Sequence, residues 1–251
     1  MRRLAGALAL GACVAAAGCG DDEAQGERPR LVVSAAASLR EPLERCAPAF
    51  ADADVRLSFG GSDELAAQIR QGADADVYAA ASTRLPDELH DAGLLEAPVA
   101  FATNELVLAV PEGSRIGGLG DLTADGTKLV VGAASVPVGA YTREALAKLP
   151  PTRERAILAN VVSEEPDVKG IVGKLVQRAG DAGFVYASDA GAAGGALRAI
   201  PLPARLEPRV AYAAGVVTAS ERPQLARRLL DDLAGGACAD ALRQAGFGPA
   251  P

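Results

Sequence analysis

The chain has 251 residues, of which 49% are hydrophobic, and its formal charge is −7. This length and composition predict a folded body of one large or two modest domains with hydrophobic cores. The acidic balance argues against a nucleic-acid partner. Beyond the N-terminal segment, no run of about 20 apolar residues predicts a membrane span.

Residues 1–18 have the pattern of an export signal. Two arginines begin the segment, an apolar run follows to Ala17, and small residues precede a cysteine. The sequence Ala16-Ala17-Gly18-Cys19 resembles the lipobox of bacterial lipoproteins, in which cleavage precedes a cysteine that receives lipid. We therefore expect Cys19 to anchor the mature protein outside the cell membrane; an ordinary cleaved signal with a chance cysteine is the alternative. Residues 19–30 are polar and predict a flexible tether.

Two predicted strand-to-helix turns follow, and each has a serine at its mouth. Residues 31–37 are apolar and small and lead to Ser38, after which apolar residues recur at helical spacing. Residues 55–59 alternate as a strand does, two glycines turn the chain, and Ser62 precedes a helix predicted over 63–71. Ser is a preferred N-cap residue, so capping alone is one interpretation. The other is that both hydroxyls and the nearby backbone N–H groups bind one small anion.

Strands and helices alternate through the rest of the chain. This alternation predicts an α/β fold with mostly parallel sheets. In such sheets ligands bind beyond the carboxyl ends of the strands. The composition near residues 101–104 and 203–208 predicts two crossings between lobes. Strands are predicted over 76–81, 104–110, 128–132, 161–162, 183–186, 198–203 and 211–218, a loop over 134–140, and helices over 83–92, 141–149, 153–160, 166–178, 221–233 and 238–245.

Two cysteines remain outside the export segment. Cys46 lies in the first predicted helix and Cys238 near the end of the chain. In an oxidising compartment they either form a disulfide or remain two buried thiols. Together they are too few for a structural zinc site, to which only His90 could add a nitrogen ligand. We therefore expect no metal cation held directly by protein ligands.

Signatures of catalysis are missing from the sequence. The single histidine, His90, lies on a predicted surface helix without a nucleophile elbow near it. Glycine-rich phosphate loops are absent as well. The acidic pairs Glu164/Glu165 and Asp231/Asp232 are expected on solvated faces. These features favour a binding protein over an enzyme.

Six short segments, in this order along the chain, resemble the molybdate-binding proteins of ABC-type importers. The resemblance spans about residues 31–248 and implies a two-lobed periplasmic-binding-protein fold. Each lobe would be an α/β unit with a mixed, mostly parallel sheet flanked by helices, and the ligand cleft would lie between the lobes. Residues 31–104 with 209–251 would form one lobe and residues 105–208 the other. The six segments are Ala35–Leu39, Phe59–Ile69, Gly72–Val77, Val136–Tyr141, Asp167–Gly170 and Gly183–Ala190.

The same resemblance implies the residues that bind the ligand. Ser38 and Ser62 would each offer a hydroxyl and a backbone N–H group. Val138 and Val168 would offer backbone N–H groups from the other lobe, and Tyr186 its phenolic hydroxyl. Four of these positions fall at starts of predicted helices, where free N–H groups and the helix dipole favour an anion. Without the resemblance, the valines would be ordinary apolar helix residues and Tyr186 a buried ring.

Two carboxylates follow Ser62 directly, at positions where the family often has uncharged residues. Acidic side chains suit the first turn of a helix because they complement its dipole. A carboxylate that pointed inward would repel an oxyanion. We therefore expect Asp63 and Glu64 to face solvent.

The resemblance implies a lipid-anchored extracytoplasmic receptor that is not an enzyme. It would capture molybdate, and also tungstate, and deliver the anion to the membrane subunits of an ABC permease. It would need no cofactor, and a monomer is expected. One alternative is a receptor for sulfate or another tetrahedral oxyanion. The alternative from a different class is an exported serine hydrolase with Ser38 or Ser62 as nucleophile, for which no general base is visible.

Overall fold

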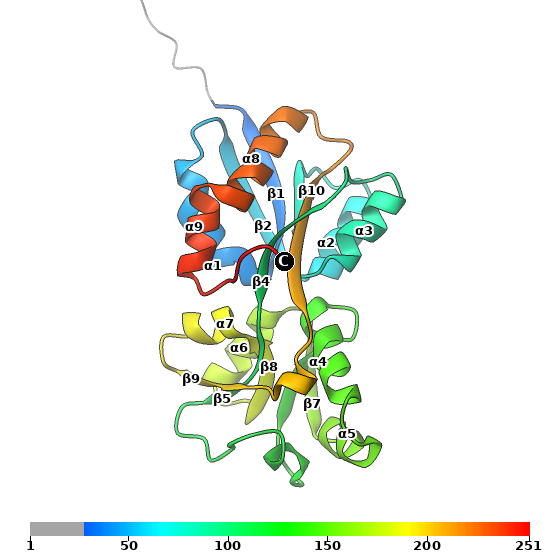
Figure 1. The fold of residues 1–251 in the computed structure, drawn as a ribbon, viewed down its shortest axis with the longest axis vertical. Helices are drawn as coiled ribbons and strands as arrows, with labels where there is room; N and C mark the ends of the chain where they lie inside the picture. Colours follow the sequence, from blue (N-terminus) through cyan, green and yellow to red (C-terminus); the bar gives the residue numbers. More distant parts are fainter. Residues whose placement is uncertain (1–27) are drawn as a thin grey trace, which may run out of the picture.

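The computed structural model describes residues 28–251 as two α/β lobes arranged along one long axis (Figure 1). The export segment, the proposed lipid anchor at Cys19 and most of the predicted tether lie outside the described residues. Within residues 28–251, no helix combines the length and apolar character needed to cross a membrane.

The first lobe contains a five-stranded sheet in the order β2-β1-β3-β10-β4. Strands β1, β2 and β3 pair in parallel, whereas β10 is antiparallel to both of its neighbours. The sheet is therefore mixed, as expected, and four of its five strands run in one direction. Its strands are β1 (Arg30–Ala36), β2 (Asp54–Gly60), β3 (Val77–Ala80), β4 (Val99–Asn104) and β10 (Val210–Val216).

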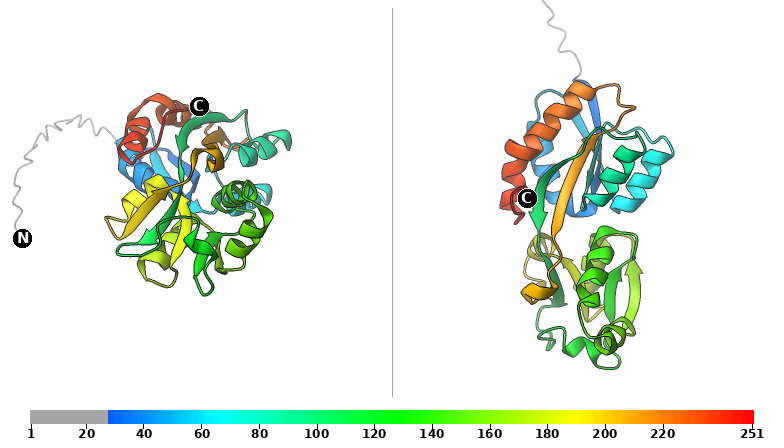
Figure 2. Two further views of the ribbon diagram at one scale, coloured as in Figure 1. Left: turned by 60° about the horizontal axis from the view of Figure 1, so that its bottom comes forward. Right: turned by 45° about the vertical axis from the view of Figure 1, so that its right-hand side comes forward.

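Helices cover both faces of this sheet. Helices α1, α8 and α9 pack together on one side, and α2 packs with α3 on the other (Figure 2). Coverage of both faces explains why all four residues of β3 are buried and apolar. The helices are α1 (Arg40–Cys46), α2 (Ser62–Arg70), α3 (Arg84–Asp91), α8 (Pro223–Gly235) and α9 (Ala237–Gln244), with short 3-10 helices η1 (Ala37–Leu39) and η2 (Ala47–Ala49).

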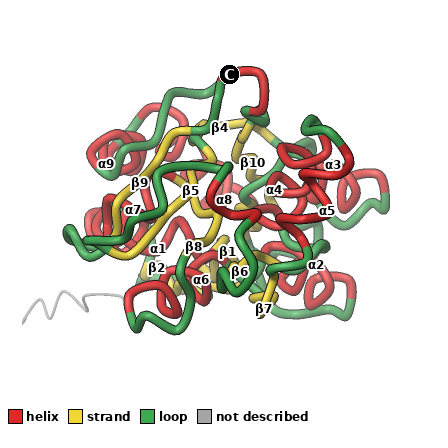
Figure 3. Tube along the Cα trace, turned by 90° about the horizontal axis from the view of Figure 1, so that it is seen from below, coloured by secondary structure: helices red, strands yellow, loops and turns green. Residues whose placement is uncertain are grey.

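The second lobe repeats this plan with the sheet order β7-β6-β8-β5-β9. Here β5 is the antiparallel strand, between β8 and β9. In a view along the long axis, helices flank the strands on both sides (Figure 3). The elements are β5 (Leu106–Pro111), β6 (Leu129–Gly132), β7 (Val161–Glu165), β8 (Ala182–Tyr186), β9 (Leu197–Pro201), α4 (Pro137–Ala147), α5 (Pro151–Leu158), α6 (Val168–Val176), α7 (Ala187–Ala192), η3 (Asp121–Thr123) and η4 (Ala204–Leu206).

Two predicted elements differ from the structure in an informative way. The single strand expected over 104–110 is two strands, β4 and β5, which meet at Glu105 and belong to different sheets. The chain thus crosses between lobes at that point, and it returns between β9 and β10 (Figure 1). The loop expected over 134–140 is confirmed for residues 134–136 but wrong beyond them, because α4 already begins at Pro137. Proline suits the first helical turn, where its missing N–H group is not needed.

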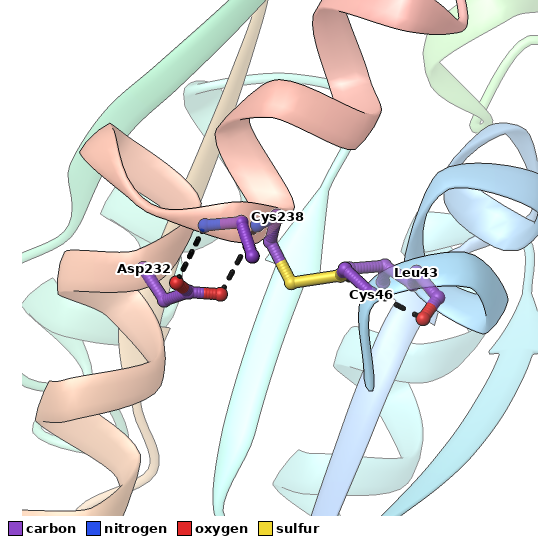
Figure 4. Close-up of a disulfide and its surroundings, with 5 residues drawn as sticks. Leu43, Cys46, Asp232 and Cys238 are labelled. Carbon is purple, nitrogen blue, oxygen red and sulfur yellow. Dashed lines mark hydrogen bonds between the residues drawn. A yellow bond between two sulfur atoms is a disulfide. The ribbon is translucent and has the colours of Figure 1, made fainter. Parts of the chain in front are cut away.

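A disulfide joins Cys46 at the end of α1 to Cys238 in α9, with the Cα atoms 5.1 Å apart (Figure 4). It links parts of the first lobe that are 192 residues apart in the sequence. Next to it, the Asp232 carboxylate accepts hydrogen bonds from the backbone N–H groups of Ala237 and Cys238, at 2.8 and 3.1 Å. The returning C-terminal helices are therefore fixed to the first helix of the chain.

Two acidic residues expected on solvated faces have structural partners instead. Asp232 holds the start of α9, as just described. Glu165 is buried at the end of β7 and lies 2.6 Å from Lys174. Burial alone would raise the pKa of Glu165, but hydrogen bonds from Lys174 and Ser163 outweigh it and lower that pKa. The prediction of solvated faces rested only on the pairing of acids in the sequence, which does not show these partners.

Candidate anion-binding site

A small cavity between the two lobes is lined by all five residues that the resemblance singled out. It lies where the carboxyl ends of β1, β2 and β8 meet the starts of four helices. Among the described residues that line it, none is Lys, Arg or His. The lining residues are Ala36, Ala37, Ser38, Gly60, Gly61, Ser62 and Ala81 from the first lobe and Val136, Pro137, Val138, Asp167, Val168 and Tyr186 from the second.

Ser38 lies in η1, the single 3-10 turn between β1 and α1, and is buried. It is not the N-cap of α1, and no side chain caps that helix, so the capping interpretation is wrong for this residue. Its Oγ instead lies 3.0 Å from the hydroxyl oxygen of Tyr212. Tyr212 belongs to β10, 174 residues further along the chain. No local pattern in the sequence could have indicated this partner.

Ser62 is the first residue of α2, and the N-cap is Gly61, so the capping interpretation is wrong here too. The Ser62 hydroxyl oxygen accepts a hydrogen bond from the backbone N–H of Ala81 at 3.2 Å. The Ser62 carbonyl oxygen accepts from the hydroxyl of Tyr78 at 2.7 Å. These two contacts hold the start of α2 against the end of β3. The backbone N–H of Ser62, in the first helical turn, has no acceptor within the helix.

The start of α4 brings the Val138 backbone to the cavity. Val138 follows Pro137 in the first turn, so its N–H group has no acceptor within the helix. The helix can begin this close to β6 because residue 139 is glycine. A Cβ atom at Gly139 would lie 1.9 Å from the carbonyl oxygen of Ala133. The Val138 side chain is buried in the core, so only the backbone of this residue is available to a ligand.

The start of α6 brings the Val168 backbone to the same cavity. Asp167 is the N-cap, and its carboxylate accepts a hydrogen bond from the backbone N–H of Gly170 at 3.0 Å. Val168 is therefore the first helical residue, and its own N–H remains without an acceptor in the helix. The positive ends of α4 and α6 both face the cavity, which favours a negative charge there.

Tyr186 ends β8 and is 1% exposed. Within residues 28–251, its hydroxyl has no hydrogen-bond partner. Its ring packs edge-to-face against Tyr212 with the centroids 5.8 Å apart. Burial, together with Tyr212 and other nearby acidic groups, raises the pKa of Tyr186 well above its usual value, so the hydroxyl keeps its proton. A buried hydroxyl without a partner costs about 1–3 kcal/mol, and a ligand oxygen in the cavity would supply the missing partner.

The two acidic residues after Ser62 differ from each other. Glu64 is exposed, as expected. Asp63 is half-buried, and its Oδ1 atom is enclosed without a partner among the described residues, so the expectation that it faces solvent is wrong. A Cβ atom at Gly61 would lie 3.0 Å from Asp63 Oδ1. Asp63 does not line the cavity, so its carboxylate does not belong to the lining that would face an anion.

Apart from the Asp167 carboxylate, which caps α6, the chemistry available to the cavity is hydrogen-bond donation by neutral groups. In the described part of the chain, neither serine hydroxyl contacts a histidine or a carboxylate. His90 is exposed on α3, and its Nδ1 lies 2.9 Å from the carbonyl oxygen of Leu95. Groups of histidine, cysteine, aspartate or glutamate that could hold a metal ion are also absent from residues 28–251. The arrangement suits a small oxyanion better than a cation.

Comparison with known sequences places the chain among exported binding proteins. Residues 31–248 match the family model of bacterial extracellular solute-binding proteins. The molybdate-binding protein ModA of Mycobacterium tuberculosis H37Rv is 36% identical over 230 residues, which cover 89% of this chain and 85% of that protein. The putative ABC transporter substrate-binding lipoprotein YvgL of Bacillus subtilis is 29% identical over 72% of this chain and 73% of its own length.

Solved structures give the same fold. The substrate-binding domain of a putative molybdenum ABC transporter from Clostridium difficile has a TM-score of 0.67 at 26% identity, over 88% of this chain and 99% of that one. The Azotobacter vinelandii periplasmic molybdate-binding protein has a TM-score of 0.74 at 19% identity, over 86% and 98%. The sulfate-binding protein SubI of M. tuberculosis has a TM-score of 0.78 at 18% identity, over 88% and 87%.

The last two likenesses, at low identity, concern the fold alone, and they confirm the expected two-lobed α/β architecture. The family match and the 36% identity to a curated relative extend over most of the chain. The chain therefore belongs to the bacterial extracellular solute-binding proteins, and it is a relative of the ModA molybdate-binding proteins.

Proposed function

We propose that this protein binds molybdate outside the cytoplasm and delivers it to the membrane subunits of an ABC importer. The observation that carries the proposal is the Tyr186 hydroxyl, a buried donor that has no partner among residues 28–251 and lies at a cavity between two lobes. The names of the curated relatives, which include ModA of M. tuberculosis, support molybdate as the anion.

The donors of the cavity suit the four oxygens of a tetrahedral anion. Ser38 and Ser62 each contribute a hydroxyl and a backbone N–H, Val138 and Val168 one backbone N–H each, and Tyr186 its hydroxyl. The Ala81 N–H already donates to Ser62 Oγ, which leaves the serine proton free for the anion. In the same way, we assign the Tyr212 hydroxyl as donor to Ser38 Oγ. Neutral donors at helix starts can thus hold a doubly charged anion.

The proposal extends to cargo range and location. Tungstate has the same charge as molybdate and nearly the same size, so we expect it to bind as well. Lipid attachment at Cys19, on the outer face of the cell membrane, is supported by the lipobox-like sequence and by the lipoprotein name of YvgL. The receptor would act as a monomer without catalysis or cofactor. Residues 31–104 with 209–251 and residues 105–208 would move as two bodies that close on the anion.

Titration calorimetry of the purified protein with molybdate, tungstate, sulfate and phosphate tests this function. We expect one-to-one binding of the first two anions and none of the others. Binding of sulfate alone would show that the protein is a receptor for a different anion. Binding of none of the four would contradict the proposal.

Replacement of a single hydroxyl tests the site itself. Ser38→Ala should weaken molybdate binding by about 1.5–3 kcal/mol, the range for a hydrogen bond to a charged group. Ser34→Ala is the matched control, because Ser34 is also buried and in the preceding strand β1 but does not line the cavity. Equal affinity of both variants and the wild type would show that the assignment of the Ser38 hydroxyl is wrong.

A further inference from the structure

The first turn of α6 and the residues just before it touch the first lobe at two places. A Cβ atom at Gly61 would lie only 2.4 Å from the carbonyl oxygen of Pro166, so the backbones of the two lobes meet there without room for a side chain. A few residues further on, the Nζ atom of Lys169 lies 2.7 and 2.8 Å from the two carboxylate oxygens of Glu41 in α1. Helix α6 also packs against η1, which contains Ser38. One segment of the second lobe therefore closes against both helix starts that carry the serines.

The Lys169 ammonium has a second partner within its own lobe. Its Nζ lies 2.9 Å from Asp189 Oδ1, on α7. The Asp189 side chain is 1% exposed, whereas that of Glu41 is 41% exposed. A buried carboxylate that lost its cation would be costly, so Lys169 stays with Asp189 whether the lobes are together or apart. Only the contact with Glu41 depends on closure.

Neither member of this contact belongs to the cavity wall. Glu41 and Lys169 are not lining residues, although Glu41 follows Ser38 by three positions and Lys169 follows Val168 directly. The ion pair can therefore stabilise the closed arrangement without a contact to the anion. When the lobes separate, Glu41 returns to water and the energy of the pair is lost.

We propose that the Glu41–Lys169 ion pair is a latch between the lobes that slows release of the bound anion, and that glycine at position 61 is required for the lobes to meet. This inference rests on the proposed function, because it concerns how long a captured anion stays. It assigns to Glu41 and Lys169 a role in residence time that is separate from recognition.

The sign of one substitution separates this latch from simple charge repulsion. Glu41→Gln removes a negative charge near a bound anion, so repulsion alone predicts slower release and tighter binding. The latch predicts the opposite, with release about fivefold faster, as for a partly exposed ion pair. The measurement is a chase of radiolabelled molybdate from the purified protein with excess unlabelled anion.

Glu44→Gln is the matched control for this experiment. Glu44 lies on the same helix and loses the same charge, but its ion pair is with Arg40 within α1. The control should release molybdate at the wild-type rate. The thermal midpoints of both variants without ligand should equal that of the wild type, because the latch acts only on closure.

Gly61→Ala tests the second contact. The residue has φ −61° and ψ 133°, which alanine adopts readily, so the added methyl group does not strain the backbone. It meets Pro166 across the interface at 2.4 Å, closer than Asp63 Oδ1 in its own lobe at 3.0 Å, so its main effect opposes closure. We expect at least about tenfold weaker retention of molybdate, from overpacking at the interface. Gly173→Ala, on α6 with no atom near the added Cβ, is the control and should retain the anion as the wild type does.

The outcomes distinguish this inference from the function on which it rests. If the wild type retains molybdate but Glu41→Gln releases it at the wild-type rate or more slowly, the latch is wrong and the receptor function stands. If Gly61→Ala retains the anion normally, the lobes do not need to meet at that position. If the wild type retains no molybdate, the proposed function fails and the latch fails with it.

Discussion

The cavity has two walls, one from each lobe, and they differ in whether their hydroxyl groups have protein partners without a ligand. In the first lobe, the hydroxyl oxygens of Ser38 and Ser62 already have protein partners, Tyr212 and the Ala81 N–H. In the second lobe, the hydroxyl of Tyr186 has no partner among the described residues. The first wall is therefore oriented before an anion arrives, which reduces the entropy cost of binding. The second wall becomes satisfied only when the anion is present.

The lobes also differ in how the chain builds them. The first lobe combines an N-terminal stretch with β10, α8 and α9 from the end of the chain, and the Cys46–Cys238 disulfide ties these parts together. The second lobe is built from one continuous stretch, β5 to β9, which contains no cysteine. A body assembled from distant segments gains most from a covalent tie, because the tie removes loop-closure entropy from the unfolded chain.

Removal of that tie should have the largest effect on stability. The double variant Cys46→Ala/Cys238→Ala should lose about 5 kcal/mol of unfolding free energy in urea, since the bridge closes a loop of 192 residues. The wild type in reducing agent should match the variant, and reducing agent should leave the variant itself unchanged. Equal urea midpoints for variant and wild type would mean that the first lobe holds together without the bridge.

A pH-dependent effect should be smaller and belong to the second lobe. Burial raises the pKa of Asp189 to about 6, although Lys169 opposes the shift. The folded protein therefore holds this proton more tightly than the unfolded chain, in which aspartate titrates near pH ~4. The stability that Asp189 contributes is fully present below about pH 4 and is lost as the pH rises through about 6.

Asp189→Asn carries no charge to bury. From pH 4 to pH 7, the unfolding free energy of the variant relative to wild type should therefore rise by up to about 3 kcal/mol. Urea unfolding at intervals across that range measures the trend. Asp87→Asn, at an exposed position on α3, should show none. A constant difference between Asp189→Asn and wild type would contradict the assignment.

The smallest effect distinguishes the two walls directly. Tyr186→Phe should leave the ligand-free stability unchanged or slightly higher, because the lost hydroxyl had no partner in the described structure, while molybdate binding weakens by about 1.5 kcal/mol. Ser62→Ala should lose about 1 kcal/mol of ligand-free stability, because the Ala81 N–H loses its acceptor. Thermal unfolding without ligand and calorimetry with molybdate measure both quantities. Equal loss of ligand-free stability in the two variants would contradict the inference that only the first wall is held by protein hydrogen bonds before the anion binds.

Much of the fold was accessible from local sequence. Alternating apolar segments and glycine-rich turns predicted the α/β class and the approximate place of most elements, because strand and helix preferences depend on near neighbours. The start of α4 at Pro137 was still predicted as loop, since proline at a helix start and proline in a loop look alike in the local sequence. The candidate binding residues came from a resemblance of whole segments, since each serine alone was compatible with capping.

The sequence by itself determined where most helix starts with free backbone N–H groups occur, because those follow from turn and helix preferences within a few residues, but it placed the start of α4 beyond Val138. Only the tertiary structure decided which of them share one cavity. It paired Ser38 with Tyr212, Cys46 with Cys238 and Glu41 with Lys169, across 174, 192 and 128 positions. Such contacts depend on how two sheets and their helices pack, and local preferences carry no information about partners at that distance.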